Sequence, residues 1–122
     1  MMTSAALYTL LSANAPLVAL VSDRIYPGRA GEDDTNPYII WQRIGTRPMP
    51  THGEANGNET FLVQFSCFGI DYETVEAVAL ALKEALDGVA LSTGDIPIYQ
   101  NWRDGGIEPV VNLYRIDLDF LI

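Results

Sequence analysis

Apolar residues recur at two spacings along the chain, and each spacing predicts a kind of element. Three leucines between positions 7 and 11 fall at helical spacing, and Thr3 or Ser4 can cap the helix that they predict. Residues 16–21 suit a second, short helix, because a proline such as Pro16 is tolerated in the first helical turn. The N-terminal part of the chain is therefore predicted to be helical.

The strongest helical pattern lies between Asp71 and Gly88. Asp71 is a good N-cap, and Gly88 stands where a glycine commonly follows a helix. Leu80 falls opposite the apolar stripe, among acidic residues, so we expect it to be exposed; contact with another subunit is the alternative interpretation. The stripe that we expect to be buried consists of Val75, Val78, Ala79, Leu82 and Leu86.

Alternating and β-branched segments predict the strands. Residues 38–44 and 60–68 are predicted to form two long strands, residues 96–103 and 112–122 two more, and residues 24–26 a short one. The glycines after residue 103 are expected to end the third long strand.

A long connection, residues 45–59, separates the first two long strands. It is rich in proline, glycine and asparagine. Because hairpin loops usually have about two to five residues, this connection is expected to be either functional or disordered.

The order of these elements predicts an α+β fold. Adjacent strands flanked by helices are typical of a mainly antiparallel sheet that is covered on one face. We expect a sheet of about four strands, two helices packed on one face and a long hairpin loop. A length of 122 residues fits a single domain, residues 1–122.

The charge balance excludes some classes of partner. The chain has 16 acidic and seven basic residues, and its net charge is −9 at pH 7. A dedicated nucleic-acid binder needs a dense basic face, and a polybasic membrane contact needs a cluster of cations. A single cysteine cannot form an internal disulfide. We therefore expect a soluble, globular protein inside the cell.

Residues that carry common chemistries are scarce. His52, the only histidine, lies in the long loop, and Cys67 shares a strand face with aromatic residues, so we expect it to be buried. One cysteine and one histidine are too few for a zinc site. Asp117 and Asp119 share a strand face and could form an acid–base pair, although a polar outer face is the simpler interpretation. No catalytic, cofactor or metal site is predicted.

Four segments together resemble one protein family. Leu-Tyr-Thr-Leu-Leu-Ser at residues 7–12 precedes Asp-Arg-Ile-Tyr-Pro at residues 23–27. Pro-Tyr-Ile-Ile-Trp-Gln follows at residues 37–42. The third segment is Phe-Ser-Cys-Phe at residues 65–68 with the helix Glu-Ala-Val-Ala-Leu-Ala-Leu at residues 76–82, and Leu-Tyr-Arg-Ile-Asp-Leu-Asp-Phe closes the pattern at residues 113–120. In this order the segments resemble the tail completion, or tail-to-head joining (tail terminator), proteins of long-tailed bacteriophages and prophages. The resemblance extends over nearly the whole chain.

The resemblance implies a non-enzymatic virion structural protein. Proteins of this family form a hexameric ring that ends the tail tube and joins it to the head connector. The implied partners are further copies of the chain, the tail tube protein and the connector protein, and genome DNA would pass through without specific binding. The implied location is the tail end of the virion, after assembly in the cytoplasm of the bacterial host. No cofactor, metal or membrane is implied.

A ring of this kind needs contacts between copies and a channel wall. Residues 45–59 are expected to be an arm that reaches a neighbour or the adjacent ring, and the scarce arginines can pair with an acidic neighbour. Asp117 and Asp119 are the candidates for the channel wall, because a wall that repels phosphate lets DNA slide. The candidate interface residues are Arg43, Arg47, Pro48, Met49, Pro50, His52, Glu54, Asn58, Leu80 and Arg103.

Two functions of other classes remain open from the sequence. The first is a small-molecule-binding or regulatory α+β domain, expected to be dimeric, which would need a pocket with converging polar groups. The second is a hydrolase that uses Asp117 and Asp119 with a divalent metal.

Overall fold

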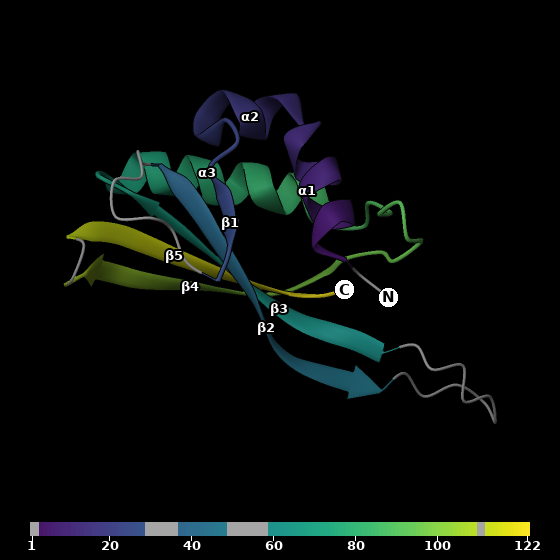
Figure 1. The fold of residues 1–122 in the computed structure, drawn as a ribbon. Helices are drawn as coiled ribbons and strands as arrows, with labels where there is room; N and C mark the ends of the chain where they lie inside the picture. The colour runs from purple at the N-terminus through teal and green to yellow at the C-terminus, as the bar shows by residue number, and fades with distance from the viewer. Residues whose placement is uncertain (1–2, 29–36, 49–58, 110–111) are drawn as a thin grey trace.

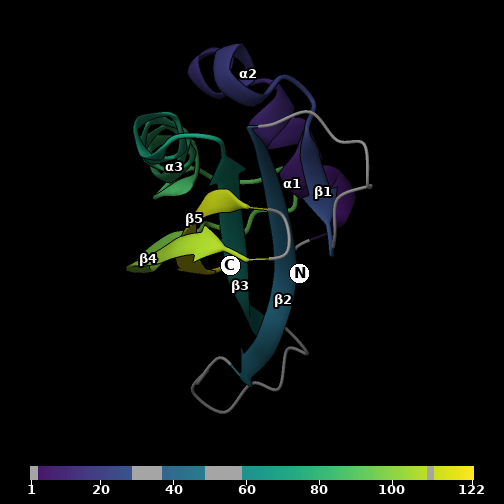
Figure 2. The same cartoon turned by 90° about the vertical axis from the view of Figure 1, so that its left-hand side faces the viewer.

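A five-stranded sheet with helices on one face forms the part of the chain that the structure describes, as Figures 1 and 2 show. The structure is a computed structural model, and it describes residues 3–28, 37–48, 59–109 and 112–122. The elements are α1 (Ser4–Ser12), α2 (Ala15–Val21), β1 (Ile25–Pro27), β2 (Tyr38–Pro48), β3 (Glu59–Gly69), α3 (Tyr72–Leu86), β4 (Ile98–Glu108) and β5 (Leu113–Leu121).

The strands follow the order β1-β2-β3-β5-β4 across the sheet. The pairs β2–β3, β3–β5 and β5–β4 are antiparallel, whereas β1 pairs with β2 in parallel. The predicted α+β class and mainly antiparallel sheet are confirmed. The expected numbers were too low, because β1 joins the sheet as a fifth strand and α2 is a third helix.

Side-chain oxygens cap the N-termini of all three described helices. Thr3, Asn14 and Asp71 each accept a hydrogen bond from the backbone N–H three residues further on, at 3.2, 3.1 and 2.8 Å. These bonds satisfy amide groups that have no partner inside the helix. The predicted caps at Thr3 and Asp71 are confirmed.

The first two helices pack on the sheet as a bent pair. Leu7, Leu11, Leu17 and Val21 are fully buried beneath them. No single described helix is long and apolar enough to cross a membrane; α1 and α2 meet that test of length and composition only when taken together across a 94° bend.

The core lies between α3 and the sheet. All five residues of the predicted stripe on α3 are buried, and Leu80 is 49% exposed on the opposite side, as expected. In the sheet layer below, the rings of Phe65 and Phe120 pack edge to face, with 5.5 Å between their centres. Burying each large apolar side chain contributes roughly 1.5–3 kcal/mol, so this layer is the main source of stability.

Several strand ends differ from the prediction. β2 extends to Pro48 and β3 begins at Glu59, and these two residues pair with each other. The predicted loop 45–59 was therefore too long at both ends. Residues 49–58 lie outside the described residues. The predicted end of the third long strand after residue 103 was also wrong: β4 passes through Gly105 and Gly106, where the pairing register shifts, and ends at Glu108. Glycine tolerates such an irregularity because it has no Cβ.

Candidate functional site

The face of the sheet that carries no helix bears a network of ion pairs across β4 and β5. Arg103 on β4 binds Asp119 on β5, with 2.5 Å between Nη1 and Oδ2. Arg115 Nε donates to Asp117 Oδ1 at 2.8 Å, and its Nη1 lies 3.4 Å from Glu108 Oε2. The alternation of β5 places these carboxylates on the face opposite the core.

This network engages both aspartates that the sequence analysis selected. Asp117 and Asp119 are each 8% exposed, because the arginine side chains cover them. The hydrogen bond to Asp119 raises the pKa of Arg103 above its ordinary value, and the bond to Asp117 does the same for the pKa of Arg115. Both arginines are therefore permanent cations that hold the carboxylates in place.

The same network weakens the interpretation of a metal-dependent hydrolase. Each carboxylate that would hold the metal already accepts hydrogen bonds from a guanidinium. Among the described residues, no group of three His, Cys, Asp or Glu side chains is placed to hold a metal ion.

Cys67 is enclosed in the core, as predicted. Its side chain is fully buried on β3, and burial raises the pKa of its thiol well above the usual range. A thiol that stays protonated is a poor nucleophile, so Cys67 acts as a small apolar residue. His52 lies outside the described residues.

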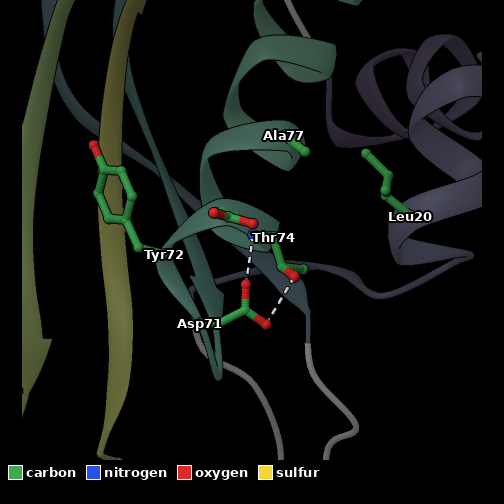
Figure 3. Close-up of a pocket in the computed structure, with 6 residues that line it drawn as sticks. Leu20, Asp71, Tyr72, Thr74 and Ala77 are labelled. Carbon is green, nitrogen blue, oxygen red and sulfur yellow. Dashed lines mark hydrogen bonds between the residues drawn. The ribbon is translucent and has the colours of Figure 1, made fainter.

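A hollow of about 650 Å³ opens between α2 and the beginning of α3, and Figure 3 shows its lining. Its lining includes two carboxylates. That of Asp71 is already engaged by the backbone N–H and the hydroxyl of Thr74 at 2.8 and 3.0 Å, and that of Glu73 is exposed. Leu20 and Ala77 line the other side. Because Asp71 is engaged within its own chain, Glu73 is the remaining carboxylate of the lining, and one carboxylate is not the converging set of polar groups that a small-molecule site needs.

The candidate interface residues fall in several places. Leu80 is on the outer face of α3, and Arg103 is in the ion-pair network within its own chain. On β2, the guanidinium carbon Cζ of Arg43 lies 4.7 Å from the ring centre of Phe61 and 5.5 Å from that of Trp41. Arg47 and Pro48 belong to the last part of β2. The other candidates, Met49, Pro50, His52, Glu54 and Asn58, lie outside the described residues.

The sequence analysis missed an exposed apolar patch beside the beginning of α3. Tyr114 on β5 pairs with Ile107 on β4 and with Gly69 on β3, so these three residues form one row across the sheet. The ring of Tyr72 contacts that of Tyr114 at 6.2 Å. Ile70 lies in the turn between β3 and α3 and is exposed. The missed signal was Ile107, an isoleucine that directly follows the glycines expected to end the third long strand.

Comparison with known proteins gives a family and a fold. The family described as "Tail completion protein gp17" matches residues 5–122. One similar solved chain belongs to a structure described as "Virion of native gene transfer agent (GTA) particle". Its TM-score is 0.76 at 24% identity, over 96% of this chain and 90% of that chain. At this identity the likeness shows a common fold. Comparison with curated protein sequences gives no match.

Proposed function

Because the chain belongs to the tail completion protein gp17 family, we propose that it forms a ring that ends a phage tail tube and joins it to the head connector. The observation that carries this proposal is the family match, which includes every strand and, except for the first residue of α1, every helix of the described structure. The proposed ring is a homo-hexamer at the tail end of the virion, assembled in the host cytoplasm. Its role is structural rather than catalytic, and its partners are the tail tube and connector proteins.

A hairpin that projects from the sheet supports contacts between copies. We call residues 43–48 of β2 and 59–61 of β3 the hairpin arm; Figure 1 shows it leaving the sheet at one end. β1 pairs with β2 only as far as Trp41, so β1 does not flank the arm. A closed ring needs two different surfaces on each copy, and a projecting arm is suited to be one of them. Arg43, Arg47 and the loop residues 49–58 belong to this proposed contact, and Leu80 is a second candidate.

The helix-free face of the sheet is the proposed channel wall. Its ion-pair network contains three carboxylates, those of Glu108, Asp117 and Asp119, and two guanidinium groups. The network therefore has no excess of positive charge with which to hold phosphate. We propose that DNA slides past this wall because cations that could bind it are already paired, which differs from a wall of bare carboxylates.

Electron microscopy of the concentrated protein tests the proposal. Negative staining should show rings with a central hole, and the same protein should be found at the end of isolated tails. Dilute protein is not informative, because assembly of a ring depends on concentration. A protein that stays monomeric at millimolar concentration and also in tail fractions would contradict the proposal.

A further inference from the structure

The apolar patch beside α3 is exposed and is held in a fixed shape. Ile107 is 51% exposed, and Tyr72 is exposed beside it. The Tyr72 hydroxyl donates to Asp104 Oδ2 at 2.9 Å, and Trp102 Nε1 donates to Asp104 Oδ1 at 2.8 Å. Asp104 thus ties the beginning of α3 to β4, so the patch is preorganised before any partner arrives.

Acidic side chains lie at two margins of this patch. Glu73 and Glu76 are exposed on the first turns of α3 and follow Tyr72 closely in the chain. Asp104 lies at the β4 margin of the patch. An apolar centre with an acidic rim fits a partner whose apolar side chain stands among cations.

The hairpin arm carries the complementary pattern. Ile44 is the extra residue where the pairing register between β2 and β3 shifts, and it is 44% exposed. Arg43 precedes it directly, and Arg47 follows three positions later. The arm therefore exposes the apolar side chain of Ile44 in a segment with two arginines. Glu59 is the one acidic residue of the arm, so the arm has a net charge of +1 in a chain that is strongly acidic.

The arm and the patch lie at opposite ends of the sheet. β3 begins in the arm and ends at Gly69, which pairs with Tyr114 in the patch row, and Figure 1 shows the two ends far apart. A chain cannot bring its own arm onto its own patch across a rigid sheet, but the next copy in a ring can. We propose that the hairpin arm of each copy docks on the patch of the next copy, with Ile44 against Tyr72 and Ile107. This inference rests on the proposed ring.

A charge exchange tests this docking. The double substitution Arg43→Glu with Arg47→Glu reverses the charge of these two arm positions. The double substitution Glu73→Lys with Glu76→Lys reverses the charge at the rim of the patch. Each double variant should remain folded by circular dichroism but form no rings, because its junctions oppose like charges. An equimolar mixture should restore rings to at least half of the wild-type yield, because every junction then joins opposite charges. Rings from either variant alone, or a mixture of folded variants without rings, would overturn the inference.

Cysteine cross-linking gives a second measurement that tolerates small losses of assembly. A mixture of Ile44→Cys and Ile107→Cys should form an intermolecular disulfide under mild oxidation, because docking brings the two side chains together. The matched control pairs Ile44→Cys with Val89→Cys, an exposed apolar position after the other end of α3. The buried Cys67 does not compete. Absence of the cross-link, or equal cross-linking to Val89→Cys, would overturn the docking. Wild-type protein without rings would overturn the ring proposal itself, and the docking with it.

Discussion

Arg115 donates from Nε to Oδ1 of Asp117 at 2.8 Å, although the two residues are only two positions apart on β5. The pair lies on the helix-free face, and Asp117 is nearly buried there. Asp117→Ala leaves this guanidinium with a longer contact to Glu108, so we expect the free energy of unfolding to fall by about 1–3 kcal/mol. Urea denaturation measures the change. Glu84→Gln, on the outer face of α3, is the control and should change stability by less than about 0.5 kcal/mol.

Gly69 marks a tight approach between the end of β3 and α3. A Cβ at this position would lie 2.7 Å from Cγ2 of Val75, which is buried. Gly69→Ala should therefore lower the stability by roughly 1–3 kcal/mol through overpacking. Gly45→Ala is the matched control, because a Cβ there meets nothing within 4 Å. Equal melting temperatures for the two variants would show that the turn yields without cost.

Asp71 makes the stability of α3 depend on pH. The backbone N–H of Thr74 donates to its carboxylate and lowers the pKa of Asp71 in the folded protein. Its contribution is therefore present above the pKa of the unfolded chain and is lost as the pH falls through the folded pKa. Asp71→Asn keeps a capping oxygen but does not titrate. Between neutral pH and about pH 3, the melting temperature of wild type should fall further than that of Asp71→Asn; parallel curves would contradict this assignment.

Substitutions of two leucines of α3 distinguish an effect on assembly from an effect on stability. Leu82 is fully buried, whereas Leu80 is half exposed. Leu82→Ala should cost about 2–5 kcal/mol of stability. Leu80→Ala should change stability by less than about 0.5 kcal/mol, and Leu80→Glu should reduce ring yield if this face meets another subunit. Normal ring yield from a folded Leu80→Glu protein would remove Leu80 from the interface.

Residues 49–58 can be replaced without disturbing the sheet. Pro48 and Glu59 pair with each other, so an Asn-Gly turn can join them as a two-residue hairpin. We expect the shortened protein to melt at the wild-type temperature but to fail in ring formation, because the loop no longer reaches the neighbour. Infectious particles assembled with the shortened protein at normal yield would refute the role of the loop.

The helices and the central strands could be predicted because each has a strong local signal. The stripe from Val75 to Leu86 has helical period, and Asp71 and Gly88 mark its ends, so periodicity and caps gave the same answer. Cys67 could be assigned to the core because its neighbours on the same strand face are apolar.

The remaining features depend on contacts between distant segments. β4 continues beyond Asp104 because β5 supplies partners for Gly106 and Ile107. A local sequence pattern does not show which residues of a distant segment will pair with it. The engagement of Asp119 by Arg103 joins residues 16 positions apart. For the same reason the apolar patch was missed: Tyr72, Ile107 and Tyr114 become neighbours only when three segments of the chain meet.

The position of β5 between β3 and β4 also determines the order in which the last two strands can join the sheet. During synthesis β4 leaves the ribosome before β5, yet β4 pairs only with β5 in the described sheet. A chain that has made β4 therefore holds an unpaired strand until β5 inserts beside it. Translation adds about 5–20 residues per second, so this exposed stage is brief. Premature termination before β5 would leave a chain that is prone to aggregate, and such a chain could not join a tail.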